Sequence, residues 1–296
     1  MPGRPLRVRG VLPALLTPFD ARGEVDEPAL RRLVRFLLAK GVHGLYPCGT
    51  TGQAVSMSVE QRRRVAAVVV GEVRRRVPVI VQVGLPDTGG TIALAKHAES
   101  IGADGVAAVT PYYYAVGEEG LEAHYRALAA AVSVPVYVYN IPRHTGVNIT
   151  PQLLARVARV PGVVGVKDSS GDFGQLLEYL ANVPDDFQVI CGTESYFLPA
   201  WLMGACASVS ATANVFPELC VQLWTAFQEG RLDAARRLQF QLNATKPILS
   251  APSLAPYYAA LAARGLPVGR PRAPLRPLKP RETARVVAAL GRLGLL

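Results

Sequence analysis

Short apolar runs rich in Val, Ile and Tyr recur along this 296-residue chain, and Gly, Pro or polar residues bound each of them. The runs are mostly continuous rather than alternating, which is typical of strands that are covered on both faces. The pattern predicts eight short strands. They lie at residues 11–19, 44–49, 78–84, 105–111, 135–142, 163–170, 187–192 and 207–212.

Amphipathic stretches with helix-start signals lie between these runs. Asp26 precedes Glu27 and Pro28, and Thr150 precedes Pro151, so each pair combines a capping side chain with an early proline. Ser58 and Gln61 have the spacing of a capping box. The expected helix ends are Lys40-Gly41, Ile101-Gly102 and Ala181-Asn182.

Eight strands that alternate with helices predict an α/β protein with a (β/α)8 TIM barrel. The barrel is expected over residues 1–230 and contains the active site. Residues 231–296 are expected to form a C-terminal helical extension, with helices at 232–249, 256–263 and 281–293, that packs on the barrel or makes oligomer contacts. A doubly wound sheet is the alternative, but the first strand, VLPALLTPFD, is not followed by a glycine-rich phosphate loop.

The composition indicates a soluble, cytoplasmic protein, and no cofactor is expected. Half of the residues are apolar, yet no apolar run reaches the roughly 18 residues of a membrane-spanning helix. The basic N-terminus, MPGRPLRVRG, is not followed by the apolar segment of a secretory signal. Four Cys and four His are scattered without metal-ligand spacing, which favours free thiols and no metal site.

The net charge of +10 raises the question of an anionic partner. The arginines are distributed along the chain on expected helices and loops, and no aromatic residues are interleaved with them. This distribution favours solvated helix faces over a nucleic-acid surface.

Catalytic side chains of a barrel project from the C-terminal ends of its strands. Lys167 ends the apolar run VVGVK and shares the strand parity of Val163 and Gly165, so it is expected to face the interior. Burial there would lower the pKa of its amine and make it a nucleophile that forms a Schiff base with a ketone or aldehyde. The alternative is a structural lysine that reaches solvent or pairs with Asp168 or Glu194.

Two further strand ends carry suitable groups. Tyr139 follows Tyr137 on one strand parity and could move a proton beside the amine, although an ordinary core aromatic would have the same pattern. The run Gly49-Thr50-Thr51-Gly52 offers backbone N–H groups and hydroxyls that suit a carboxylate or phosphate.

Four motifs now appear in order: GTTGQ, TPYYY, YNIPRHTG and GVKDSSGD, with LLTPF before them and TANVFPE after. Over about residues 8–296 the chain resembles the dihydrodipicolinate synthase / N-acetylneuraminate lyase superfamily of class I pyruvate aldolases. The resemblance implies a homodimer or homotetramer that uses pyruvate or another 2-oxo acid.

The resemblance also implies residue roles. Lys167 would form the Schiff base, and Tyr139 would be the general acid and base. Thr50 would link Tyr139 to Tyr113, which members of this superfamily contribute across a dimer interface. Thr51, with its own backbone amide and that of Thr50 in the loop that begins at Gly49, would hold the pyruvate carboxylate. Backbone carbonyls near Gly192 and Val209 would line the imine pocket.

Departures from the superfamily pattern affect the second substrate. Dihydrodipicolinate synthases carry an arginine directly before Thr-Gly in YNIPRHTG, where this chain has His144 and places Arg143 one residue earlier. Sialic-acid lyases carry an Asp-Glu pair after the seventh-strand glycine, where this chain has Thr193 and Glu194.

The leading interpretation is therefore an aldolase or lyase for a 2-keto-3-deoxy sugar acid, whose hydroxyls Ser169 and Glu194 could bind. Dihydrodipicolinate synthase, with Arg143 or His144 as the carboxylate clamp, is the first alternative. A dehydratase that uses the same imine is the second. A barrel that only binds a small ligand is the non-enzyme alternative.

Overall fold

The computed structural model describes residues 6–249 and 253–296, and the chain divides into two compact units. The first unit comprises Met1–Gly10 and Pro78–Val209, and the second comprises Val11–Val77 and Ser210–Leu296. The first five residues of the basic N-terminus, on which part of the sequence interpretation rests, lie outside the described residues. The expected division at residue 230 stays a prediction.

The described residues form seven regular strands in one sheet, in the order β1-β7-β6-β5-β4-β3-β2. Every paired stretch from β2 to β7 is parallel. β1 passes from the first unit into the second, and the last residue of β7 begins the second unit. The strands are β1 (Gly10–Pro13), β2 (Ile80–Gln82), β3 (Gly105–Val109), β4 (Val136–Asn140), β5 (Val163–Asp168), β6 (Gln188–Cys191) and β7 (Ala207–Ser210).

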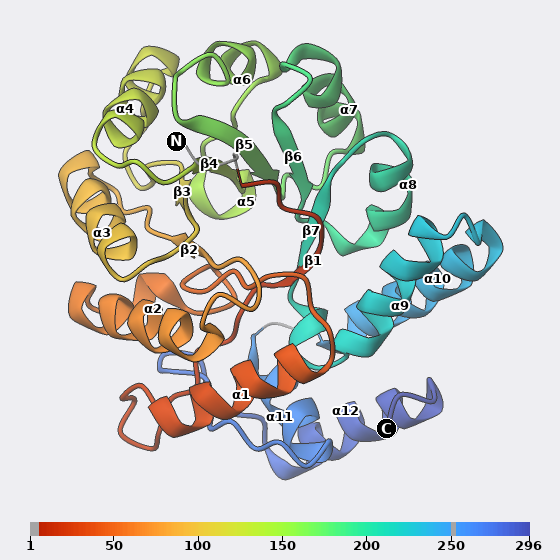
Figure 1. Cartoon of the computed structure of the whole chain (residues 1–296). Coiled ribbons are helices and arrows are strands. Elements are labelled where there is room, and N and C mark those ends of the chain that lie inside the picture. The colour runs from red at the N-terminus through yellow and green to blue at the C-terminus, as the bar shows by residue number, and fades with distance from the viewer. Residues whose placement is uncertain (1–5, 250–252) are drawn as a thin grey trace. The chain divides into compact units, whose positions relative to one another are not determined.

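Helices of the first unit alternate with these strands and lie around the outside of the sheet (Figure 1). Nearly every strand residue of this unit is buried, as expected for strands covered on both faces. The helical segments are α3 (Thr88–Ser100), α4 (Glu118–Ala130), α5 (Pro142–Thr145), α6 (Pro151–Val157), α7 (Phe173–Asn182), η2 (Glu194–Tyr196) and α8 (Phe197–Leu202).

The second unit is mainly helical. Its segments are α1 (Glu27–Ala39), η1 (Ala54–Ser56), α2 (Val59–Val73), η3 (Thr212–Asn214), α9 (Pro217–Gln228), α10 (Leu232–Leu249), α11 (Ala255–Ala263) and α12 (Pro280–Arg292). The three helices expected after residue 231 are present as α10, α11 and α12. The predicted α/β class, a TIM barrel followed by a helical part, is confirmed.

The predicted strand at 44–49 is wrong as a regular strand. Only an isolated parallel bridge joins Ala14 to Tyr46, whose N–H donates to the Pro13 carbonyl at 3.0 Å. Pro47 has no N–H to extend the pairing, and Cys48 adopts a φ of 60° that a strand does not allow. The apolar pattern therefore identified a chain segment beside β1 but overstated its regularity.

The predicted helix starts are confirmed. The Asp26 and Thr150 side chains accept hydrogen bonds from the third residues of their helices, Ala29 and Leu153. Ser58 and Gln61 form the reciprocal capping box, at 3.2 Å from the Gln61 N–H to the Ser58 Oγ and 3.1 Å from the Ser58 N–H to the Gln61 Oε1. Each cap satisfies N–H groups that a helix start leaves unpaired.

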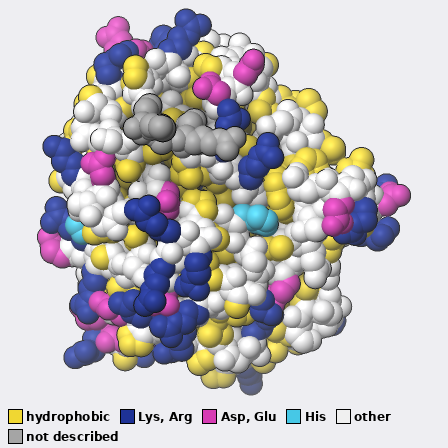
Figure 2. Space-filling view, viewed as in Figure 1, with side chains coloured by type: hydrophobic (Ala, Val, Ile, Leu, Met, Phe, Trp, Pro, Cys, Tyr) yellow, Lys and Arg dark blue, Asp and Glu magenta, His cyan; other side chains and the backbone are white. Residues whose placement is uncertain are grey.

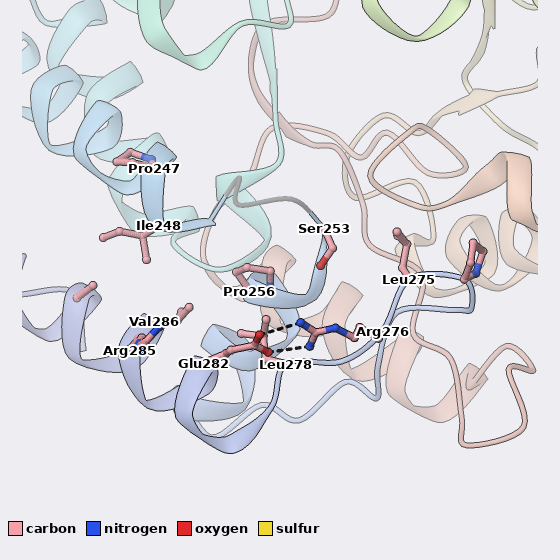
Figure 3. Close-up of a pocket in the computed structure, with 12 residues that line it drawn as sticks. Pro247, Ile248, Ser253, Pro256, Leu275, Arg276, Leu278, Glu282, Arg285 and Val286 are labelled. Atoms are coloured by element: carbon pink, nitrogen blue, oxygen red, sulfur yellow. Dashed lines mark hydrogen bonds and ion pairs between the residues drawn. The ribbon is translucent and has the colours of Figure 1, made fainter.

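The second unit also contains a cavity of about 560 Å³ between the end of α10, α11, α12 and the chain that precedes α12 (Figure 3). Its walls include the apolar side chains of Ile248, Leu275 and Val286. Arg276 and Glu282 form a bidentate ion pair at the cavity, with both distances 2.7 Å. This cavity belongs to a different unit from the lysine predicted to be catalytic.

Candidate active site

Lys167 and Tyr139 lie directly opposite each other on the adjacent parallel strands β5 and β4. Both side chains are buried, at 4% and 2% exposed. The Lys167 Nζ lies 3.9 Å from the centre of the Tyr139 ring. The structure therefore brings together the two residues that the sequence marked as amine and phenol, each at the C-terminal end of its strand.

Burial lowers the pKa of Lys167, because the protonated amine loses its hydration. The nearby Tyr139, which hydrogen-bonds to the amine, acts in the opposite direction, as does the charge of Asp168. The positive charge of Arg143 lowers the Lys167 pKa further. The balance enlarges the fraction of neutral amine, which is the nucleophilic form.

Gly192 leaves room for this lysine. Its N–H donates to the Asp168 carbonyl at 2.7 Å, which holds the end of β6 against the end of β5. A Cβ at position 192 would lie 2.1 Å from the Ser169 Oγ and 3.2 Å from the Lys167 Cε. Gly192 and Ser169, both predicted from the sequence, are thus neighbours of the lysine side chain.

A second row of side chains, one residue further along the strands, was not predicted as functional. Asn140 and Asp168 face each other in register, and the Asn140 Nδ2 donates to the Asp168 Oδ1 at 2.9 Å. Asp168 is fully buried, and burial raises the pKa of its carboxyl. The signal in the sequence was a polar residue directly after both Tyr139 and Lys167, at the ends of two apolar strands.

One alternative for Lys167 was a structural lysine that forms a salt bridge with Asp168. The Asp168 carboxylate is not that partner, because its hydrogen bonds go to other groups. Its Oδ1 accepts from the Asn140 side chain and, at 3.3 Å, from the Ser170 N–H. Its Oδ2 accepts from the Ser170 Oγ at 2.7 Å. Strand alternation explains the difference, because successive side chains point to opposite faces of the sheet.

Arg143 and His144 lie on the short helix α5, directly after β4. Both side chains are largely exposed. Partial burial and the charge of Arg143 lower the pKa of His144, so its imidazole is mainly neutral at pH 7. Arg143, though one residue earlier than the superfamily arginine, still acts electrostatically on Lys167.

Three other predicted site residues lie in the first unit. Tyr113 is 87% exposed, adopts a φ of 81°, and packs edge-on against Tyr114 with ring centres 5.1 Å apart. Glu194 is partly exposed at the start of η2, and Val209 is buried in β7. Tyr113 thus projects outward, whereas Val209 belongs to the sheet.

Gly49, Thr50 and Thr51 belong to the second unit. Their loop is closed by hydrogen bonds from the Gln53 N–H to the Thr50 carbonyl at 3.0 Å and from the Ala54 N–H to the Gly49 carbonyl at 3.3 Å. Gly49 is buried and both threonines are at least partly exposed. The roles expected of these three residues toward Lys167 stay predictions.

Within residues 6–249 and 253–296, no group of three or more His, Cys, Asp or Glu side chains is arranged to hold a metal ion. Four free thiols occur in this part of the chain, at Cys48, Cys191, Cys206 and Cys220. No described helix is both long and apolar enough to cross a membrane.

The chain matches the model of the dihydrodipicolinate synthetase family over residues 7–293. It is 41% identical to an uncharacterised DapA-like lyase of Halobacterium salinarum, over 99% of this chain and 97% of the relative. It is 39% identical to a 4-hydroxy-tetrahydrodipicolinate synthase of Nitratidesulfovibrio vulgaris, over 98% of this chain and 100% of the relative.

Among solved structures, YagE from E. coli K12 in complex with pyruvate is similar to the chain. The TM-score is 0.94 at 29% identity, over 97% of this chain and 99% of YagE. The likeness thus extends across the whole fold and includes a protein with bound pyruvate.

Proposed function

Because the chain belongs to the dihydrodipicolinate synthetase family, whose members are pyruvate-dependent lyases, we propose that Lys167 is the Schiff-base lysine of this carbon–carbon lyase. The neutral amine attacks the C2 carbonyl of pyruvate, and water leaves to give an iminium ion. Loss of a C3 proton gives an enamine whose C3 attacks the carbonyl carbon of an aldehyde. Water then hydrolyses the imine and releases the product, and cleavage follows the same steps in reverse.

The contact between the buried Lys167 amine and Tyr139 carries this proposal. A phenol beside the amine can give a proton to the departing hydroxyl during imine formation and take one back during hydrolysis. Such proton transfer contributes about 10²–10⁴-fold to a rate. Burial of Lys167 excludes water from the amine and so favours its neutral form.

Borohydride trapping tests the proposed nucleophile. Incubation with pyruvate and borohydride should add one reduced pyruvyl group per chain, and peptide mapping should locate it at Lys167. The Lys167→Ala variant is the control and should gain no mass. An unchanged wild-type mass, or an adduct on another lysine, would disprove the assignment.

For the second substrate, we propose the aldehyde that forms a 2-keto-3-deoxy sugar acid. Position 144 carries a neutral imidazole rather than a fixed cation, and Ser169 and Glu194 are polar groups able to bind substrate hydroxyls. A panel of 2-keto-3-deoxy acids, assayed for pyruvate release, tests this choice. Absence of turnover across the panel would reject it.

4-Hydroxy-tetrahydrodipicolinate synthesis is the second candidate. The electrostatic effect of Arg143 on Lys167 supports it, because a cation near the amine could hold the carboxylate of aspartate semialdehyde. The name of the 39%-identical relative supports it as well. A coupled assay with pyruvate and aspartate semialdehyde separates the two candidates, since a lyase for 2-keto-3-deoxy sugar acids should turn over little aspartate semialdehyde.

A dehydratase that uses the same imine would expel water and release no pyruvate from a sugar acid. Product analysis of the same panel distinguishes dehydration from cleavage.

We further propose that the protein is a homo-oligomer of two or four chains, because the aromatic pair Tyr113 and Tyr114 is largely exposed.

A further inference from the structure

We propose that Asn140 and Asp168 are positioning residues, whose side-chain hydrogen bond fixes the geometry of the Tyr139–Lys167 pair and of the segment that carries Arg143 and His144. This inference rests on the proposed function of Lys167. It concerns two side chains that face away from the amine and act on it through the backbone.

The C-terminal ends of β4 and β5 pair in register beside the amine. Tyr139 is paired with Lys167, and Asn140 is paired with Asp168 one step beyond. The second pair is joined by side chains, at 2.9 Å from the Asn140 Nδ2 to the Asp168 Oδ1. A direct bond at this point limits sliding or separation of the two strand ends at the residues next to the reacting groups.

After α5 the chain returns to the end of β4. The Asn140 Oδ1 accepts from the Ile149 N–H at 3.0 Å, and the Asn140 Nδ2 donates to the Asn148 Oδ1 at 2.9 Å. Tyr179 on α7 donates its hydroxyl to the Ile149 carbonyl and lies 3.2 Å from the Asn140 Nδ2. One amide thus fastens the far end of the segment from 141 to 149 to the end of β4.

The hydrogen-bonded pair is buried. Asn140 and Asp168 are both 0% exposed. Buried polar groups are costly unless they are hydrogen-bonded, so a network in which both members are satisfied specifies one arrangement and disfavours others. An apolar pair of similar volume would fill the space without this orientation. The network thus favours a role in geometry over a role in packing alone.

Reaction rates depend steeply on such geometry, because a displacement of about 1 Å between reacting groups can cost roughly 100-fold. Asn140→Ala and Asp168→Ala should therefore lower kcat and the rate of borohydride trapping with pyruvate by about 10–100-fold. The number of sites trapped after long incubation should stay one per chain, and the melting temperature should stay above the assay temperature.

Two comparisons separate positioning from general destabilisation. Asp168→Asn keeps the shape and the acceptor for Asn140, so it should retain activity within about threefold of wild type, as a hydrogen-bonding role requires. Ser208→Ala changes a buried residue in the same register row, two strands away. The Ser208 Oγ has no hydrogen-bond partner among the described residues, so this control should leave trapping unchanged.

Trapping at the wild-type rate by both alanine variants, with wild-type kcat per trapped site, would overturn the positioning role and leave the Schiff-base proposal intact. Wild-type protein that forms no adduct would overturn both. If neither alanine variant folds, Asn140→Asp keeps the side-chain volume but places two carboxyl groups together. Slow trapping by this variant supports the inference, and wild-type trapping rejects it.

Discussion

At the scale of single residues, the most informative feature is a cation placed where water is excluded. Lys167 is 4% exposed, and burial lowers the pKa of its amine. Burial favours the neutral amine that the proposed reaction requires, and it destabilises the folded state whenever the amine is protonated. The proposed reactivity of this residue is therefore linked to the stability of the fold.

Lys167→Met should reveal that link. Because the Lys167 pKa is lower in the folded than in the unfolded state, the unfolded state binds more protons between the two values, and stability rises with pH there. The cost is full below the folded pKa and vanishes above the unfolded value of about 10.4. Urea denaturation should show Lys167→Met to be more stable than wild type at pH 6, with a difference that shrinks by pH 10. A pH-independent difference would contradict this.

Tyr139→Phe should separate proton transfer from packing. The ring remains while the hydroxyl is lost, so turnover should fall by about 10²–10⁴-fold with little change in melting temperature. Tyr137→Phe, a change on the same strand and the same parity, is the matched control. Steady-state kinetics of the two variants would refute a proton-transfer role if both lost activity equally.

At the scale of elements, the ends of β5 and β6 are packed so closely that one position has no room for any side chain. A Cβ at Gly192 would lie 2.7 Å from the Asp168 carbonyl oxygen, as well as close to Ser169 and Lys167. Backbone atoms cannot yield as a flexible side chain would. The approach of the two strands is thus set by the absence of a Cβ.

Gly192→Ala should therefore displace the end of β6 and slow imine trapping. Overpacking of this kind costs about 1–3 kcal/mol, which chemical denaturation can measure. Gly71→Ala is the control, because nothing lies within 4 Å of a Cβ at that position in α2. Alanine there should stabilise the helix by about 0.5–1 kcal/mol. Equal effects of the two changes would exclude the steric explanation.

The sequence predicted those elements that depend on local chemistry. The Ser58 cap and the Pro151 helix start act within a single turn, so their spacing was sufficient. Lys167 and Tyr139 could be chosen as candidate site residues because an amine and a phenol lie at the ends of apolar strands. The Asn140–Asp168 bond could not, because it depends on the register between residues 28 positions apart. A regular strand was wrongly predicted at 44–49, because an apolar pattern carries no information about the backbone angle φ of Cys48.

At the scale of the whole molecule, several of the basic side chains behind the net charge of +10 are paired with acidic ones. Figure 2 shows Lys and Arg side chains interspersed with Asp and Glu on the visible face. Arg35 pairs with Glu72 at 2.7 Å, and Arg156 pairs with Glu118 at 2.6 Å. Ion pairs at a surface add little to stability, but they reduce the charge available to a polyanion.

The oligomeric state is the testable property at this scale. Light scattering coupled to size exclusion should give at least a dimer at micromolar concentration, because two large aromatic side chains at Tyr113 and Tyr114 are 87% and 75% exposed. Tyr113→Arg should shift the protein toward monomer by adding a charge to the apolar contact. Leu202→Arg, another exposed apolar position, is the comparison. A monomeric wild-type protein at this concentration would contradict the predicted oligomer.

The buried Cys191 thiol can be used to measure local opening of the sheet. Burial raises the pKa of the Cys191 thiol to about 12, so a thiol reagent can react only when the sheet around this residue opens. Cys191 sits in register with Asp168 on one side and Ser208 on the other. The rate at which Cys191 is alkylated therefore measures how often the strand ends beside the lysine separate. A ligand that holds those strand ends together should slow the alkylation of Cys191.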